Sequence, residues 1–522
     1  MNGGAADSAW MKISTSCDAT WYTKERKCRK HFMENKNQRN KKTRAEGPLH
    51  KFMHAGKKST EPQDTRGTAA SRGSQRPHDA RKGAYAGRRG PQQGRGSVKT
   101  PEKKISEMSR EKTAATPRSI AVLSLMKILE EKKLSHIVLR DALSAHPDWT
   151  ARDRAFVTRL VEGTLEYTIQ IDFILNQLSK THTKNMEPLV RTVLRMGSYQ
   201  ILYMDKVPDS AAINEAVELV KSQEDKVFFL SGFVNGVLRS VSRDKEVIFR
   251  NLAHTGKTPA YIRYSVPLWM YDALKKVYGR EETERMLAWF LEGEKKNFVR
   301  FQDGHCEEME GDIVHSEAFR RGEITIQDYA SQQVGIEADP QPGDQVVDVC
   351  AAPGGKSCHI AALLEGTGHV DARDLTEAKV ALIEQNIARQ QLTNITAQLH
   401  DARMPDPTLL DADGQGTADI VIADLPCSGL GILGKKPDIR FNASREGIRE
   451  LQKLQREILD TVCSYVKPGG KLLYSTCTLT KEENEDNRDY LLAKGGFTLE
   501  KERKFLPGEP SDGFYLTVFR KE

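Results

Sequence analysis

The 522-residue sequence contains no run of 18 or more apolar residues and no apolar stretch near its first methionine. A membrane-spanning helix needs about 20 consecutive apolar residues, so none is expected. A secretory signal peptide needs a short apolar core, so none is expected either. A mean hydropathy of −0.57 is consistent with both exclusions. We therefore expect a cytoplasmic protein.

Paired cysteines are also lacking. None of the eight cysteines forms a CxxC pair, which argues against a zinc site, and no metal is expected. In a cytoplasmic protein the thiols are expected to be reduced. An unusual cysteine is therefore available as a nucleophile.

Charge is unevenly distributed along the chain. Residues 1–118 carry a net charge of +17, so the remainder carries −10 of the overall +7. Net charge is therefore no argument for RNA binding by the body of the protein, although a local basic face could still bind RNA. The basic segment is either a solvated tail, an arm that grips RNA non-specifically, or a start-site error with Met108 as the true first residue.

Composition and periodicity divide the chain into four parts. Residues 1–117 are rich in Lys, Arg, Gly, Ser and Pro without an apolar period, which predicts a disordered basic tail. Residues 118–245 have helical apolar spacing. Residues 246–340 mix helical stretches with short strand candidates and are interpreted as a linker and small α+β subdomain. Residues 341–522 alternate strand, turn and helix, which predicts an α/β doubly wound sheet.

The helical part has a clear buried face. Val190, Leu194, Gly197, Ile201 and Met204 recur at steps of three and four, as on one side of a helix. The order of the helices and the phrase "AINEAVELVK…FVNGVLR" resemble the NusB-like helical domain. That resemblance implies an RNA-binding module. A bundle with only a packing role remains an alternative.

The first chemical motif lies where the strand "QVVDV" runs into the turn Cys350–Lys356. Gly354 and Gly355 let the backbone approach a ligand closely, and ligands of open α/β sheets bind at such strand ends. Asp374 follows a second strand, 19 residues beyond Gly355, near the offset of an acid that bonds the ribose of a nucleotide-like cofactor. GxGxxG and Walker patterns are absent, so NAD and ATP are less favoured.

Further strand ends carry two acids and two cysteines. Asp401 follows "ITAQL", where an adenine-contacting acid is expected, although a surface Asp is an alternative. Asp424 ends the strand "DIVIA" and is followed by Pro426 and Cys427. Cys477 ends the strand "KLLYST". Two cysteines at the ends of neighbouring strands, both facing one cleft, are less easily explained as packing residues.

Together, DxCAAPGGK, DxPCSG and STC resemble the motifs of RNA cytosine-C5 methyltransferases. With the helical domain in front, residues 118–522 resemble the bacterial RsmB (Sun, Fmu) family of 16S ribosomal RNA methyltransferases. The resemblance implies a Rossmann-like fold and S-adenosyl-L-methionine as cofactor. It implies a monomer whose partner is RNA, either 16S ribosomal RNA or a partly assembled small subunit. It implies Cys477 as the nucleophile, Cys427 as the group that helps release the product, and Asp424 as a third catalytic residue. The implied cofactor-binding residues are Cys350, Ala351, Ala352, Pro353, Gly354, Gly355, Lys356, Asp374, Asp401 and Asp424.

The expected chemistry is covalent. Addition of the Cys477 thiolate to C6 of cytosine makes C5 nucleophilic towards a methyl group. The base must first leave its stack. The sequence departs from the family pattern at Leu425, His400 and "KNFVRFQ". Alternatives are a tRNA or 23S ribosomal RNA substrate, an inactive RNA-binding assembly factor, and a small-molecule methyltransferase.

Overall fold

The computed structural model describes residues 116–522, except 223–226, 294–296, 312 and 509. The expected basic tail, apart from its last two residues, lies outside the described residues, as does the alternative start at Met108. Within the described ranges, no helix is both long and apolar enough to cross a membrane.

The first part of the described chain is entirely helical, as expected. Its core contains Val190, Leu194 and Ile201, so the predicted buried face of the helix over this stretch is confirmed. Glycine at position 197 lets a neighbouring helix approach, because a Cβ there would lie 2.9 Å from the side chain of Leu238. The helices are α3 (Pro117–Leu129), α4 (Ser135–Ser144), α5 (Ala151–Leu178), α6 (Pro188–Tyr203), α7 (Asp209–Lys221), α8 (Ser231–Arg243) and α9 (Lys245–Ala253).

Local sequence signals set several helix starts. Thr116 and Ser119 form a capping box at the start of α3, where Pro117 occupies the first turn. Thr150 and Asp153 form a second capping box at the start of α5. Each box satisfies backbone N–H groups that have no partner inside the helix.

The middle part combines helices with a small sheet. The strand order is β2-β1-β3, with β1 antiparallel to both neighbours. The elements are α10 (Ala260–Arg263), α11 (Leu268–Glu292), β1 (Asn297–Phe301), β2 (Cys306–Met309), α12 (Glu317–Arg320), β3 (Ile324–Ile326) and α13 (Tyr329–Ala338). The last of these helices lies before the expected boundary at 340/341, yet its Ala330 and Val334 pack into the core of the following large sheet.

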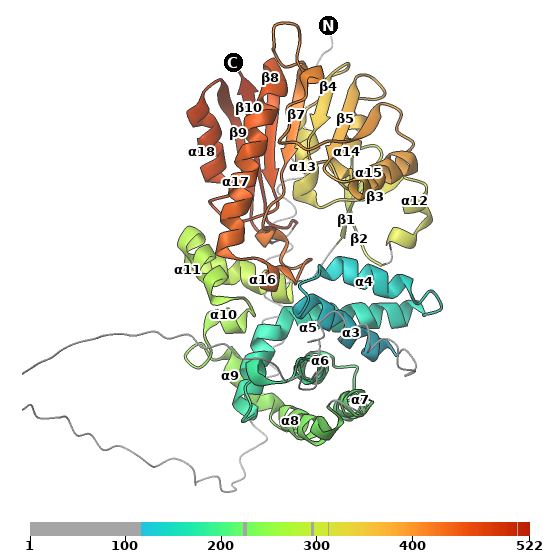
Figure 1. Ribbon diagram of the computed structural model, residues 1–522, viewed down its shortest axis with the longest axis vertical. Coiled ribbons are helices and arrows are strands. Elements are labelled where there is room, and N and C mark those ends of the chain that lie inside the picture. Colours follow the sequence, from blue (N-terminus) through green and yellow to red (C-terminus); the bar gives the residue numbers. More distant parts are fainter. Residues whose placement is uncertain (1–115, 223–226, 294–296, 312, 509) are drawn as a thin grey trace, which may run out of the picture. The chain divides into compact units, whose positions relative to one another are not determined.

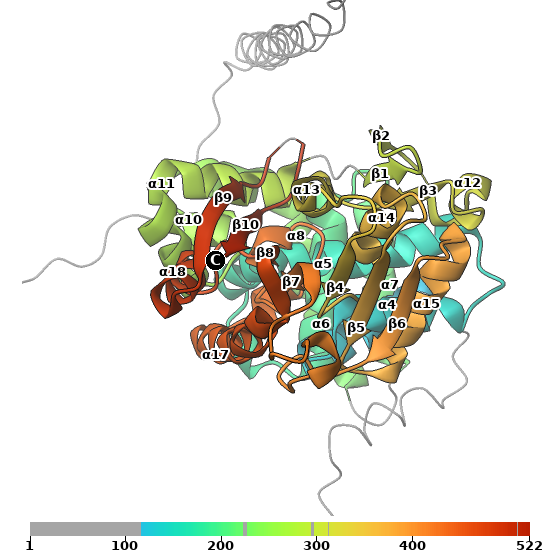
Figure 2. The same cartoon turned by 90° about the horizontal axis from the view of Figure 1, so that it is seen from above.

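The last part is a seven-stranded sheet with the order β6-β5-β4-β7-β8-β10-β9 (Figures 1 and 2). The first five strands in this order are parallel, and β10 is antiparallel to both of its neighbours. The predicted doubly wound Rossmann-like sheet is therefore confirmed. The strands are β4 (Gln345–Asp348), β5 (His369–Asp374), β6 (Ile395–Leu399), β7 (Ala418–Asp424), β8 (Val466–Thr476), β9 (Phe497–Phe505) and β10 (Phe514–Lys521).

Helices cover both faces of this sheet because the side chains of each strand alternate between faces. Val346 packs with α13, α14 (Gly355–Leu363) and α15 (Glu377–Gln390), whereas Val347 packs with α17 (Arg445–Val462) and α18 (Glu485–Lys494). Figure 2 shows the two groups of helices on opposite sides of the strands. The short α16 (Ile439–Asn442) precedes α17. The 3-10 helices are Thr183–Asn185, Phe228–Leu230, Ile313–His315, Pro407–Leu409, Leu430–Ile432 and Cys463–Tyr465.

Strand order reverses at β4, since β5 and β6 lie on one side of it and β7 and β8 on the other. Ligands of such sheets bind outside the carboxyl ends of the strands at this reversal. The fold therefore predicts a ligand site at the residues that follow β4, β7 and β8.

Candidate active site

The turn after β4 carries the glycine-rich motif. Gly354 has φ of +101° and caps α14, a conformation that side-chain-bearing residues rarely adopt. A Cβ on the next residue, Gly355, would meet open space. The backbone is thus exposed to a cavity at the start of α14, whose first N–H groups have no partner inside the helix.

That cavity, the cofactor pocket, has a volume of about 280 Å³. It fits a cationic nucleotide-like cofactor because acidic side chains, exposed backbone and apolar surface meet in it. Of the expected cofactor-binding residues, Cys350, Ala351, Ala352, Pro353, Gly355, Lys356 and Asp424 line it.

Asp348, at the end of β4, also lines the cofactor pocket and is 1% exposed. Its carboxylate accepts a hydrogen bond of 2.6 Å from the Ser357 hydroxyl. Burial raises the pKa of Asp348 to about 7, with a further increase from Asp424. Asp348 is the first residue of the DxCAAPGGK motif, but it is not among the expected site residues. Its position at a strand end was the signal that could have included it.

Lys356 and Asp424 form an ion pair inside the cofactor pocket, with Nζ 2.6 Å from Oδ2. Burial lowers the pKa of Lys356, but attraction to Asp424 outweighs burial, so this pKa lies above its ordinary value. The other carboxylate oxygen of Asp424 accepts a hydrogen bond of 2.7 Å from Ser475 Oγ. Each carboxylate oxygen of Asp424 thus has its own partner.

Three expected cofactor residues do not line this pocket: Gly354, Asp374 and Asp401. Asp374 is buried behind the pocket wall, where it accepts a hydrogen bond of 3.0 Å from Ala352 N and pairs with Lys379 at 2.8 Å. Asp401 pairs with Arg403 at 2.6 Å in the turn after β6. Asp374 therefore supports the motif turn directly, whereas Asp401 is engaged in a local ion pair.

The two strand-end cysteines meet. Cys427 follows β7, Cys477 follows β8, and these strands are parallel neighbours, so their carboxyl ends lie together. The two Sγ atoms are 3.3 Å apart. The expectation that neighbouring strands bring both cysteines to one site is thus met geometrically.

The environment makes Cys477 the more acidic thiol of the pair. A hydrogen bond from the Cys427 thiol lowers the pKa of Cys477 against the effect of burial, and Lys356 and Lys436 lower it further. Cys427 faces Glu483 and Asp424, and its pKa is raised by the hydrogen bond to Cys477 and by burial. Among the cysteines of residues 116–522, only Cys477 has a lowered pKa. Burial raises the pKa of Cys306, Cys350, Cys358 and Cys463.

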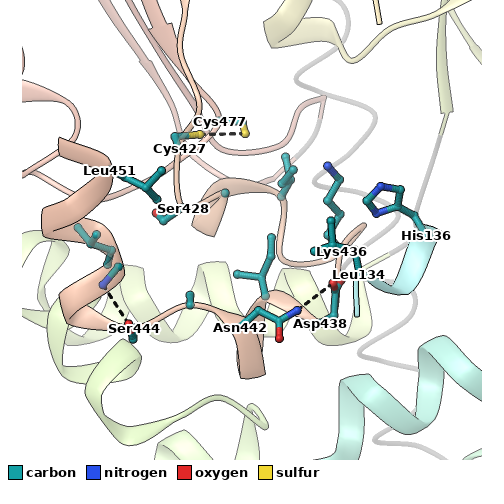
Figure 3. A pocket seen from close by; sticks show the side chains of 16 residues that line it. Leu134, His136, Cys427, Ser428, Lys436, Asp438, Asn442, Ser444, Leu451 and Cys477 are labelled. Carbon is teal, nitrogen blue, oxygen red and sulfur yellow. Dashed lines mark hydrogen bonds between the residues drawn. The ribbon is translucent and has the colours of Figure 1, made fainter. Parts of the chain in front are cut away.

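Cys477 also lines a second cavity, of about 300 Å³ (Figure 3). We call it the base pocket. Cys427 lines this pocket only, whereas Cys477 lines both this pocket and the cofactor pocket. The Cys477 sulfur thus lies at the junction of two cavities, an arrangement that suits transfer between two bound molecules.

Glu483 anchors the loop that carries Cys427 and was not expected from the sequence. It is fully buried, and its carboxylate accepts hydrogen bonds from Ser428 N at 2.8 Å and from Ser428 Oγ at 2.5 Å. Thr480 and Gln455 donate to the same carboxylate at 2.7 and 3.1 Å. Glu483 lies in the charged run "KEENEDN", whose composition is typical of a solvated surface and gives no sign of burial.

A second unexpected group lines the outer part of the cofactor pocket. Asp328 and Asp512, from segments far apart in the sequence, both pair with Lys435, at 3.2 and 2.7 Å. Phe514 lines the same pocket and lies under Lys356, whose Nζ is 5.4 Å from the ring centre. No spacing in the sequence links these residues.

Comparison with known proteins shows which families the chain matches. The model of the RsmB/F 16S rRNA methyltransferase family matches residues 336–519, and that of the NusB family matches residues 115–243. "Probable ribosomal RNA small subunit methyltransferase B" of Bacillus subtilis is 32% identical over 394 residues, covering 71% of this chain and 86% of that protein. The Proteus mirabilis ribosomal RNA small subunit methyltransferase B is 28% identical, covering 79% of this chain and all of that protein.

Among solved structures, PH0851 has a TM-score of 0.64 at 24% identity, covering 79% of this chain and all of that one, a likeness of fold. The fold, the cofactor pocket and these relatives define an S-adenosylmethionine-dependent RNA methyltransferase. The chain belongs to the ribosomal RNA small subunit methyltransferase B family.

Proposed function

We propose that the protein methylates C5 of a specific cytosine in 16S ribosomal RNA through a covalent intermediate on Cys477. The observation that carries this proposal is the cysteine pair: a thiolate with a lowered pKa lies 3.3 Å from a second thiol, at the junction of two cavities. The resemblance of the motifs to RNA cytosine-C5 methyltransferases supports the same chemistry.

In the first step, Cys477 Sγ attacks C6 of the cytosine and forms a carbon–sulfur bond. Electron density moves towards C5 and N3. Asp424, held by Lys356 and Ser475, is proposed to bond the N3/N4 edge of the base and to support protonation of N3. C5 would then take the electrophilic methyl group that bound S-adenosylmethionine supplies, with S-adenosylhomocysteine as the leaving group.

In the second step, the proton on C5 is removed and the carbon–sulfur bond breaks, which returns Cys477 as a thiolate. We assign the removal of this proton to Cys427. Its raised pKa is caused first by the hydrogen bond to Cys477. Once Cys477 is bound to carbon, that cause disappears and the pKa of Cys427 falls, so Cys427 can pass its proton to solvent and then accept the proton from C5.

For the cofactor, we propose binding by Cys350, Lys356, Asp424 and the backbone between the first two. The motif turn is proposed to hold its carboxylate-bearing end through backbone N–H groups. Asp374 and Asp401 remain proposed contacts of the ribose and adenine, although Asp374 is paired with Lys379 and Asp401 with Arg403. The division at 117/118, 245/246 and 340/341 is part of the same proposal.

The choice of 16S RNA is supported by the names of the relatives and by the NusB family match in front of the methyltransferase part. Its test is to incubate separated 16S, 23S and transfer RNAs with the protein and S-adenosylmethionine. Nucleoside mass spectrometry then measures 5-methylcytidine, and bisulfite sequencing locates it. One protected cytosine in 16S RNA is expected. Protection confined to 23S or transfer RNA would overturn the substrate, and a methylated nucleoside other than 5-methylcytidine would overturn the reaction.

A further inference from the structure

The base pocket includes residues from the helical part of the chain. The backbone N–H and hydroxyl of Ser135, the first residue of α4, donate to the two carboxylate oxygens of Asp438 at 3.2 and 2.7 Å. These two residues are 4% and 3% exposed, and they lie 303 positions apart in the sequence. Asn442 donates to the same carboxylate at 3.3 Å. This buried contact, the Ser135–Asp438 latch, fixes the start of α4 at the pocket.

As a result, the next residue, His136, lies at the rim of the base pocket beside Lys436 (Figure 3). Burial lowers the pKa of His136, and Lys436 lowers it further, so the ring is neutral at pH 7 and can still donate a hydrogen bond. Within the described part of the chain, neither side chain has a hydrogen-bond or ion-pair partner. Both are therefore available to a ligand.

The base pocket offers a ligand a positive charge. Apart from Cys477, the charged residues that line it are Lys436 and Asp438, and the Asp438 carboxylate is already bonded by Ser135 and Asn442. Lys436 is thus the free cation of the pocket. A cation at the rim, with the cysteine pair at the other end, matches a nucleotide whose base enters and whose phosphate stays outside.

We propose that Lys436 and His136 bind the RNA phosphate backbone at the target nucleotide, so that the helical domain forms part of the active site. This inference rests on the proposed function, because it takes the base pocket as the place of the target cytosine. The latch is a positioning contact: it holds His136 without touching the RNA.

The test measures binding of a 20-nucleotide single-stranded RNA of mixed sequence by fluorescence anisotropy across a salt series. Lys436→Ala is expected to weaken binding by roughly five- to tenfold and to reduce the slope of log affinity against log salt by about 0.7, the contribution of one phosphate contact. Lys453→Ala is the matched control, because Lys453 is an exposed lysine outside the pocket. An unchanged slope in Lys436→Ala, or no measurable binding by the wild type, would overturn the proposal.

His136 and the latch are tested with the same RNA. His136→Ala is expected to weaken binding about tenfold, as for loss of one hydrogen bond to a charged group. Arg140→Ala, on the same helix but outside the pocket, is the control and should bind as the wild type does. Ser135→Ala is expected to weaken binding in the wild type but not in a His136→Ala background. Equal effects in both backgrounds would refute positioning through His136. Nucleoside mass spectrometry of 16S RNA treated with the wild type tests the proposed reaction independently. A failure of that reaction can thus be told apart from a failure of the binding prediction.

Discussion

The sulfur of Cys477 lies 3.3 Å from that of Cys427, and of the two only Cys477 faces both the cofactor pocket and the base pocket. The pair holds one negative charge more readily than two, because like charges at this distance repel. The proton stays on Cys427, beside the buried carboxylate of Glu483. This asymmetry supports the proposal that Cys477 is the nucleophile and Cys427 its assistant.

Removal of Cys477 should abolish the reaction without removing the cofactor site. Cys477→Ala is expected to lower the rate of methyl transfer by on the order of 10⁴-fold or more, as for other covalent nucleophiles. Binding of S-adenosylmethionine, measured by calorimetry, is expected to stay within about threefold, since the motif turn and the Lys356–Asp424 pair remain. Cys463→Ala, a cysteine outside both pockets, is the control and should keep full activity. Methyl transfer at the wild-type rate by Cys477→Ala would refute the assignment.

The lowered pKa of Cys477 should depend on its neighbour. The first cause of that lowering is the hydrogen bond from Cys427. In Cys427→Ala this bond is lost, so the pKa of Cys477 is expected to rise, and alkylation of Cys477 by iodoacetamide should need a higher pH. The measurement is the rate of alkylation of Cys477 against pH, followed by peptide mass spectrometry. Identical profiles in the two proteins would show that Cys427 does not stabilise the thiolate.

Asp348 should make cofactor selection depend on pH. Its pKa of about 7 means that the carboxyl is neutral below this pH and negative above it. S-adenosylmethionine carries a sulfonium charge that S-adenosylhomocysteine lacks. The preference for the former, measured as a ratio of dissociation constants, is therefore expected to increase from pH 6 to pH 8.

The titration of Asp348 should lower the free energy of unfolding as pH rises, whereas it raises the cofactor preference. The folded pKa is raised from 3.8, so the stabilising contribution of the protonated form is fully present below about pH 4 and is lost as pH rises from there to about 7. In Asp348→Asn, this decline in stability should be absent, and the cofactor preference should be flat from pH 6 to pH 8. A preference that still increases with pH in the variant would assign the effect to another group.

Glu483 should act on the rate rather than on RNA binding. Its carboxylate holds both the backbone and the hydroxyl of Ser428, next to Cys427. Glu483→Gln replaces one acceptor oxygen by a donor, so the loop should shift and unfolding should become easier by about 1–3 kcal/mol. We expect kcat to fall and KM for RNA to change little, as measured in steady-state methylation assays. A change confined to KM would contradict a role in placing Cys427.

His359 should contribute to loss of stability in acid. It is 2% exposed, packs against Gly335, and burial lowers its pKa to about 3. A histidine with a lowered folded pKa stabilises the protein above about pH 6.5, and this contribution is lost as pH falls towards about 3. The free energy of unfolding should therefore drop by up to about 1.4 kcal/mol per pH unit over this range. In His359→Leu, urea unfolding should lack this part of the decline.

Much of the fold could be predicted because its signals are local. The strands β4, β7, β8 and β10 each contain a short apolar run that is visible in the sequence. The edge strand β9 was missed. Its sequence "FTLEKERKF" is mostly charged and exposed, as is common for edge strands, so it lacks the apolar run of a central strand.

The site residues likewise divide into those with a local sequence signal and those that only folding brings together. Cys427 and Cys477 could be predicted to meet because each follows a strand of one parallel sheet. Glu483 could not, because its burial depends on Gln455, Ser428 and Thr480, which surround it only after folding. His136 reaches the base pocket through the latch, which joins two segments with no shared pattern.

The most direct test of the account is whether Cys427→Ala traps RNA. Without Cys427, the proton on C5 should stay in place and Cys477 should remain bound to C6. The protein is incubated with 16S RNA and S-adenosylmethionine, digested with nuclease, and its intact mass is measured under denaturing conditions. The account predicts a covalent protein–nucleotide adduct in Cys427→Ala that is absent from the Cys427→Ala/Cys477→Ala double variant. An adduct that persists in the double variant, or full turnover by Cys427→Ala without an adduct, would contradict it.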